Sequence, residues 1–223
     1  MTFSLLGRCG QSGRLGMVIS SSSPAVAARC AHARPGVGLA ASQNVTDPRL
    51  GPALLDALER DSDPRTALSS VVDGAPHIDH RQLAILDVRG AAAAYSGTRT
   101  LGTHGHRIGA DCAAAGNLLA DESVLDAMTA AFAAGANRDL GDRLVAVLRA
   151  ALEAGGEAGP VHSAGLLMIG EVAWPVADLR VDWHGDPIGE LRRVWDVYKP
   201  QLDDYVTRAL DPSAAPGYGV PGE

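Results

Sequence analysis

Strand-like and helical segments occur in blocks along this chain rather than in alternation. Short apolar segments bounded by glycine and polar turns predict strands, and amphipathic segments predict helices. Two blocks of strands are each followed by a pair of helices, and two further strands and a last helix complete the chain. Strands grouped in this way form hairpins and a mainly antiparallel sheet system, with helices packed outside it. The sequence therefore predicts an α+β fold.

The boundaries of these elements follow from local patterns. We expect strands at residues 2–8, 14–20, 36–42, 81–87, 91–97, 106–117, 163–170 and 177–182, and helices at residues 50–60, 63–72, 122–132, 139–153 and 186–198. Asp63 and Asp186 each precede a proline at the first helical position, which predicts two N-caps. Pro200 is expected to kink or end the last helix.

The length of the chain favours one domain. A chain of 223 residues can bury one substantial core. We therefore expect a single domain over residues 1–210. Residues 211–223 are rich in Pro and Gly and contain too few apolar side chains to fold alone, so we expect a tail there.

The charge and the cysteines exclude several classes of protein. A net charge of −7 with scattered basic residues argues against a nucleic-acid partner. Cys9, Cys30 and Cys112 are odd in number and widely spaced, so the sequence indicates neither a disulfide framework nor a thiolate zinc site. An apolar run long enough for a membrane helix and the regions of a signal peptide are both missing. These features are typical of a cytoplasmic protein that binds no membrane.

Thr2 directly follows the initiator methionine and opens the first predicted strand. A small side chain at this position allows aminopeptidases to remove Met1, which would leave a threonine that carries both a hydroxyl and an α-amine. An α-amine has a pKa of about 8, so it can act as the general base for the hydroxyl of its own residue. The alternative is that Thr2 is only a β-branched residue in a strand.

Six short segments of the chain stand out when they are taken in order: residues 1–8, 15–22, 33–43, 80–83, 116–120 and 178–182. Together they resemble the domain of unknown function family 1028. Members of that family are described as relatives of the N-terminal-nucleophile (Ntn) hydrolases. The resemblance covers the chain from residue 2 to about residue 193, and it implies an Ntn-hydrolase-like four-layer αββα sandwich of two stacked, mainly antiparallel sheets.

The order of the segments also resembles the bacterial proteasome-like peptidases, and this resemblance implies a site. Thr2 matches the nucleophile, and Asn44 and Asn117 match turns that stabilise the oxyanion or hold the amine and substrate. The residues expected to bind substrate are Ser20, Ser21, Ser22, Arg34, Gln43 and His80. The chain departs from the peptidases where they have an acidic residue after the second strand and a nearby lysine. Serines occupy the first position, and only Arg29 or Arg34 could supply the cation.

Two histidine pairs raise the question of a metal site. His104 and His106 are two residues apart, and His77 and His80 flank Asp79. A third ligand at a fixed spacing is missing from both pairs, so we interpret them as polar surface loops and expect neither a metal nor another cofactor.

The leading hypothesis is therefore a small-molecule amidohydrolase of the Ntn type that cleaves an amide, ureido or related C–N bond. Two alternatives remain open. One is a hydrolase or deaminase that uses a bound water, with Thr2 only structural. The other is a non-catalytic ligand-binding or assembly protein on the same fold.

An aromatic stripe near the C-terminus predicts self-association. Trp195, Tyr198, Leu202 and Tyr205 are spaced by three and four residues, so they lie on one helical face. Aromatic side chains are favoured in interface cores. We expect a homo-oligomer, a dimer or a multiple of dimers, with residues 195–220 at a subunit contact. The alternative is that the stripe packs on the chain's own sheets.

Overall fold

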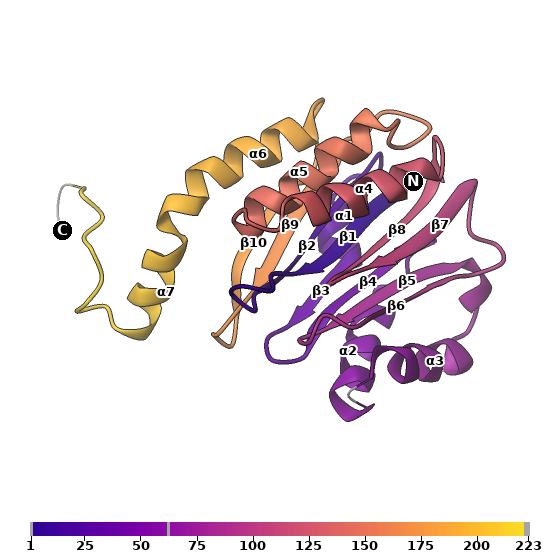
Figure 1. Cartoon of the computed structure of the whole chain (residues 1–223), viewed down its shortest axis with the longest axis horizontal. Coiled ribbons are helices and arrows are strands. Elements are labelled where there is room, and N and C mark those ends of the chain that lie inside the picture. The colour runs from indigo at the N-terminus through magenta and orange to yellow at the C-terminus, as the bar shows by residue number, and fades with distance from the viewer. Residues whose placement is uncertain (1, 62, 221–223) are drawn as a thin grey trace.

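Two antiparallel sheets lie face to face, and helices cover the outer face of each sheet (Figure 1). The computed structural model describes residues 2–61 and 63–220. The strand pairings within each sheet run antiparallel. The predicted α+β class with two antiparallel sheets is therefore confirmed.

The larger sheet has the strand order β10-β9-β2-β1-β8-β7, so its first strand lies in the interior of the sheet. Phe3 lies opposite Ser20 on one side, and Thr2 lies opposite Asn117 on the other. The start of β1 is therefore flanked by the ends of β2 and β8. The strands are β1 (Thr2–Arg8), β2 (Leu15–Ser21), β7 (Thr103–Gly109), β8 (Cys112–Leu119), β9 (Ser163–Ile169) and β10 (Pro175–Val181).

The smaller sheet has the order β3-β4-β5-β6. Gln43 pairs with Gln82, and Asn44 pairs with Arg81, at the end of the sheet that lies nearest to Thr2. The strands are β3 (Ala31–Arg34), β4 (Gly38–Asn44), β5 (Arg81–Asp87) and β6 (Ala92–Ser96).

The helices form the outer layers. α4 (Ser123–Ala134), α5 (Leu140–Glu153) and α6 (Pro187–Tyr198) cover the larger sheet, and α2 (Leu50–Asp61) and α3 (Pro64–Gly74) cover the smaller one (Figure 1). The remaining helices are α1 (Val26–Cys30), η1 (Ile78–His80), η2 (Lys199–Gln201) and α7 (Leu202–Leu210). The predicted N-caps are confirmed, because Asp63 accepts from the Thr66 amide and Asp186 from the Gly189 amide. The helices in the described ranges are too short or too polar to cross a membrane.

Alternation along β1 separates the two main cores. Phe3 and Leu5 pack against the outer helices, whereas Leu6 packs among residues of the opposite sheet. Successive side chains of a strand point to opposite faces, so Thr2 and Ser4 share the inner face with Leu6. The nucleophile predicted from the sequence therefore faces the space between the two sheets.

Two predictions about the elements are wrong, and two elements were overlooked. Residues 106–117 are not one strand, because Asp111 adopts a left-handed conformation (φ 57°) and turns the chain between β7 and β8. Aspartate tolerates this conformation in turns. His104 and His106 consequently lie on β7 rather than in a loop. The sequence analysis also overlooked α1 and β3, which are short and carry no strong periodicity.

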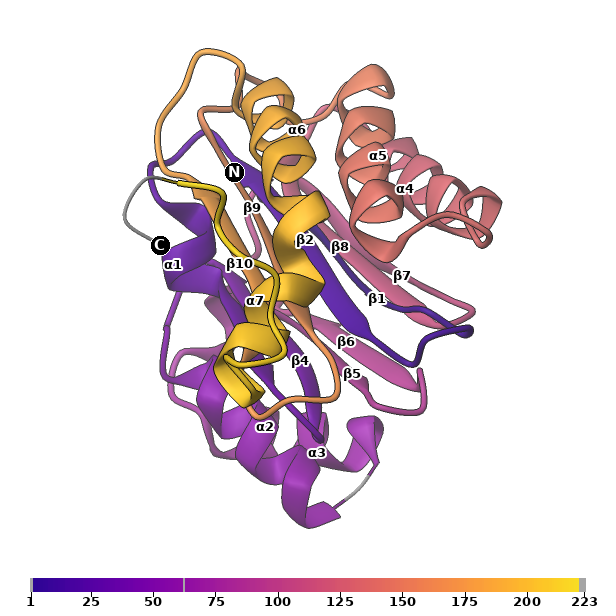
Figure 2. The ribbon, with the colours of Figure 1, turned by 90° about the vertical axis from the view of Figure 1, so that its left-hand side faces the viewer.

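The C-terminal stripe packs in part on the chain itself. Trp195 is fully buried against α5, where its indole N–H donates to Asp142 at 2.9 Å. The helical path changes to η2 at Pro200 and continues as α7, as the proline predicts. Residues 211–220 contain no helix or strand and run beside α7 (Figure 2), held there by the Arg208 guanidinium, which donates to the Pro216 carbonyl.

Candidate functional site

Thr2 lies in a polar, buried environment at the start of β1. Its side chain faces the space between the sheets, and the residue is only 5% exposed. The Thr2 hydroxyl donates to the Ser21 hydroxyl across a long 3.4 Å contact. Asn117, directly opposite Thr2 on β8, shares its sheet face and is fully buried. Side chains opposite each other in an antiparallel pair are close enough to touch one ligand.

The three serines at the end of β2 have different surroundings. Ser21 faces Thr2, whereas Ser20 lies on the other face of the sheet and donates to the Ser163 carbonyl at 2.9 Å. Ser22 contributes its backbone amide, which donates to the carboxylate of Glu157. Of the three, Ser21 is therefore the one whose hydroxyl can assist Thr2 directly.

Glu157 is an acidic residue of this site that the sequence analysis missed. It lies in the loop between α5 and β9, is 5% exposed, and accepts from the Ser22 amide at 3.1 and 3.2 Å. It also forms an isolated bridge with Leu119, just beyond Asn117. Ser22 follows the end of β2 and Leu119 ends β8, and these two strands flank the start of β1, so Glu157 lies beside the start of β1. Burial raises the pKa of its carboxyl to about 7, against the hydrogen bonds from Ser22.

A chain of buried amide side chains connects the two sheets behind Thr2. The Ser4 hydroxyl donates to Gln43 at 2.8 Å, and Gln43 donates to Gln82 at 2.8 Å. Asn117 donates to the same Gln82 oxygen at 3.1 Å. Gln82 was also missed, although a glutamine directly before the apolar run Leu83–Leu86 was a visible signal.

Asn44 lies at the same end of the two sheets as Thr2. It adopts a left-handed conformation (φ 75°), and its amide group donates to the His80 carbonyl at 2.6 Å and accepts from the Leu101 amide at 3.3 Å. Leu101 in turn accepts from the Leu118 amide, next to Asn117. The Asn44 side chain is therefore engaged in holding loops together.

Comparisons with known proteins identify the family. The family of unknown function DUF1028 matches residues 2–191. The chain belongs to this family. It is similar to the DUF1028 protein SPO2555 from Silicibacter pomeroyi, whose crystal structure gives a TM-score of 0.83 at 32% identity over 89% of each chain. Anbu (ancestral beta-subunit) from Yersinia bercovieri covers 98% of this chain and 100% of its own, with a TM-score of 0.40 and 10% identity. A search of curated proteins gave no match.

The two candidate cations of this DUF1028 chain lie in different places. Arg29 donates to the Ser23 hydroxyl at 2.9 Å, and the Ser23 hydroxyl is 2.8 Å from that of Ser21. Arg34 is instead paired with Asp56 and Glu59 of α2. The structure therefore brings Arg29, and not Arg34, to the serines beside Thr2.

The histidines of the DUF1028 chain do not converge. His80 lies 3.8 Å from the carboxylate of Asp79 and contributes its carbonyl, not its ring, to the contact with Asn44. His106 lies 3.4 Å from the Ser96 hydroxyl, and burial lowers the pKa of its ring. Within residues 2–61 and 63–220, no three His, Cys, Asp or Glu side chains are grouped so that they could hold a metal ion.

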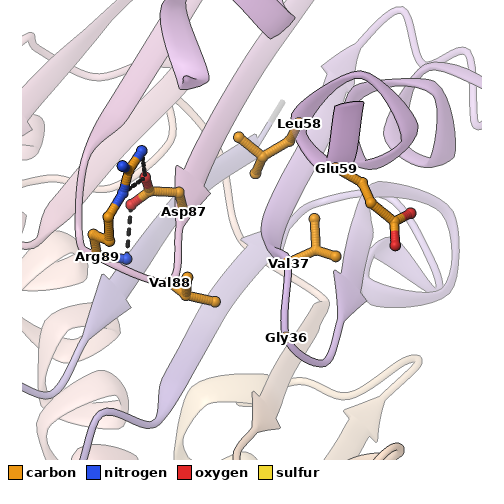
Figure 3. A pocket seen from close by; sticks show the side chains of 7 residues that line it. All are labelled: Gly36, Val37, Leu58, Glu59, Asp87, Val88 and Arg89. Carbon is orange, nitrogen blue, oxygen red and sulfur yellow. Dashed lines mark hydrogen bonds and ion pairs between the residues drawn. The ribbon is translucent and has the colours of Figure 1, made fainter. Parts of the chain in front are cut away.

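A cleft of about 330 Å³ lies at the other end of the sheets (Figure 3). Arg8, the last residue of β1, donates to the carbonyl of Val88 in the wall of this cleft. β1 has seven residues, so the cleft is about 20 Å from Thr2. Asp87 accepts from the amide and guanidinium of Arg89, which holds the β5–β6 turn. Serine, threonine, cysteine and histidine are missing from the described residues that line the cleft. The lining residues are Gly36, Val37, Leu58, Glu59, Asp87, Val88 and Arg89.

Proposed function

We propose that this protein is a small-molecule amidohydrolase of the Ntn type, with Thr2 as the nucleophile once the residue before it has been removed. The observation that carries the proposal is the position of Thr2 at the start of an interior strand, between Ser21, Asn117 and Glu157. A hydroxyl, a buried amide and a buried carboxyl around one threonine have no evident need in a strand that is only structural. The burial of these groups favours a small substrate over a protein.

The proposed reaction has two halves. The Thr2 hydroxyl attacks the carbonyl carbon of an amide or ureide, and its proton passes to the α-amine of the same residue. Backbone amides near Asn44 stabilise the oxyanion, at about 3 kcal/mol for each donor. The C–N bond then breaks as the amine returns the proton to the leaving nitrogen, and an ester remains on Thr2. Water hydrolyses this ester and releases the acid, which restores the threonine.

Glu157 gives the α-amine an acidic neighbour. The carboxylate lies beside the start of β1, where the amine of an N-terminal Thr2 would be. A carboxylate there stabilises the ammonium that forms when the amine accepts the hydroxyl proton. In this proposal Glu157 replaces the acidic residue that the proteasome-like peptidases have after their second strand.

The test of the proposal is whether Thr2 is the N-terminal residue of the purified protein. We expect the intact mass to lack one methionine. Periodate, which cleaves only a residue with adjacent amine and hydroxyl groups, should convert Thr2 to a glyoxylyl group with loss of acetaldehyde and ammonia. Thr2→Ala, equally compatible with methionine removal, should be inert to periodate. An active preparation that retains Met1 would contradict the proposal.

One observation favours the water-based alternative. A carboxyl with a pKa of about 7 is suited to act as a general base near neutral pH. In that case Glu157 would activate a water molecule, and Thr2 would only help to bind the substrate. Activity that survives in a protein with residue 1 still attached would support this function.

The pKa of Glu157 predicts a dependence of stability on pH. The folded chain keeps its proton up to about pH 7, whereas an unfolded glutamate releases it near pH 4.5. The folded state therefore binds more protons in this window, and the free energy of unfolding falls by about 3 kcal/mol as the pH rises from 4.5 to 7. In Glu157→Gln this decline should disappear. Urea unfolding of the wild type and Glu157→Gln between pH 4.5 and 7 measures this decline. If the free energy of unfolding depends on pH in the same way in both proteins, the prediction is wrong.

We also propose that the protein is a homo-oligomer that uses the C-terminal region. α6, α7 and the tail expose Val197, Leu210 and Tyr218, although Trp195 is used within the chain. Deletion of residues 211–223 should weaken association before it lowers the unfolding temperature. Light scattering at micromolar concentration measures this. A monomeric wild type, or a truncated chain that assembles equally well, would contradict the prediction.

A further inference from the structure

The side-chain oxygen of Asn117 is a buried hydrogen-bond acceptor that no described residue satisfies. Asn117 is fully buried, and its Oδ1 has no partner in residues 2–61 and 63–220. An unsatisfied buried polar atom destabilises the folded state, so such an atom usually has a ligand or a functional reason. The question is whether the amide could simply rotate and remove the problem.

Gln82 prevents that rotation. Its Nε2 faces two backbone carbonyls, those of Gly105 at 3.0 Å and Gly116 at 2.9 Å. Carbonyls only accept, so the atom that faces them must be the amide nitrogen. The oxygen of Gln82 is thereby fixed on the opposite side, toward Gln43 and Asn117.

The fixed oxygen of Gln82 determines the orientation of the next two amides. Gln43 and Asn117 both have to present their nitrogens to it, at 2.8 and 3.1 Å. Gln43 then satisfies its own oxygen with the Ser4 hydroxyl. Among the described residues, Asn117 has no such neighbour for its own oxygen. The amide cannot rotate to put its nitrogen there instead, because the nitrogen must face Gln82.

Asn117 lies beside the proposed nucleophile. Asn117 and Thr2 are directly opposite in the β1–β8 pair and share the face between the sheets. The Thr2 hydroxyl contacts Ser21 on the side away from β8, so the β8 side of Thr2 faces Asn117. Side chains opposite each other in an antiparallel pair have Cβ atoms about 5 Å apart, so the acyl group of a substrate bonded to Thr2 would be within reach of Asn117.

We infer that Asn117 is a specificity-determining residue whose Oδ1 accepts a hydrogen bond from an N–H of the substrate. The inference rests on the proposed function and narrows its substrate class. The acyl part of the substrate carries an N–H donor within one carbon of the carbonyl that Thr2 attacks, as in N-acylamino amides. Substrates with only ether, ester or alkyl groups at that position leave the Asn117 oxygen unsatisfied and are disfavoured.

A matched pair of boronic acids tests this inference without a known substrate. In acetamidomethylboronic acid, boron takes the place of the attacked carbon and accepts the Thr2 oxygen, while the hydroxyl proton passes to the α-amine. Acetoxymethylboronic acid has the same shape but an oxygen in place of the N–H. We expect the wild type to bind the amide probe at least about tenfold more tightly than the ester probe in calorimetry. In Asn117→Ala the two affinities should become equal, and Thr2→Val should bind neither probe.

The outcomes separate the inference from the function on which it rests. Equal binding of both probes by the wild type, with Thr2→Val binding neither, would overturn the inference and leave Thr2 as the nucleophile. A preference for the amide probe that persists in Asn117→Ala would also overturn it. If the wild type binds neither probe, or Thr2→Val binds them as well as the wild type does, both fail. The wild-type comparison needs no variant, so poor folding of Asn117→Ala would not remove the test.

Discussion

Thr2→Ala should reduce turnover by about a thousandfold or more, because it removes the atom that forms the bond to the substrate. The effect on stability should be small. The hydrogen bond that is lost, to the Ser21 hydroxyl, is long at 3.4 Å, and the packing of Phe3 and Leu5 against the helices does not depend on it. The measurement is release of amine or ammonia from a panel of small amides and ureides, together with the thermal unfolding curve.

Two matched variants of Thr2 sharpen this result. Thr2→Ser keeps the hydroxyl and should keep measurable turnover, whereas Thr2→Val keeps the shape without the hydroxyl and should lose it. Alanine, serine and valine are all small enough to permit removal of Met1, so the state of the N-terminus is the same in each protein. Wild-type rates in Thr2→Ala would exclude the nucleophile role and favour a reaction in which Glu157 activates water.

Gln82→Leu should lower the free energy of unfolding by about 4 kcal/mol, because it leaves several buried polar groups without a partner at once. Leucine fills a similar volume but can neither accept from Gln43 and Asn117 nor donate to the carbonyls of Gly105 and Gly116. These groups lie between two sheets where water is excluded. Urea unfolding monitored by tryptophan fluorescence measures the loss.

Ser96→Ala is the control for this prediction. Ser96 also contacts Gln82, at 3.0 Å, but lies nearer the surface, and its removal leaves Gln82 with its two carbonyl partners. The expected loss is under about 1 kcal/mol. A Gln82→Leu protein as stable as Ser96→Ala would mean that the network does not hold the sheets together, and the fixed orientation of Asn117 would lose its basis.

The resemblance and the structure each identified different residues of the site. The resemblance pointed to Thr2, Ser21 and Asn117, and these three residues do lie together. It offered Arg29 and Arg34 as equal candidates for a cation, and the contacts with Ser23 on one hand and Asp56 on the other separate them.

The sequence by itself determined the elements whose signals are local. Short apolar segments bounded by turns predicted β1 and β5, leucine spacing predicted α2, and the Asp-Pro pairs predicted the caps at Asp63 and Asp186. Each of these depends on residues a few positions apart, so the pattern is complete within the segment. The turn at Asp111 was missed because it interrupts a segment whose composition is otherwise continuous.

Only the tertiary structure decided which polar groups meet around Thr2. Glu157 reaches Ser22 across 135 positions of the chain, and Gln82 reaches Asn117 across 35. Such contacts are set by strand order and register, which depend on how the separate cores pack and not on any one segment. The pKa of Glu157 and the orientation of the Asn117 amide follow in turn from burial, because water would otherwise satisfy both groups. No spacing in the sequence encodes that exclusion of water.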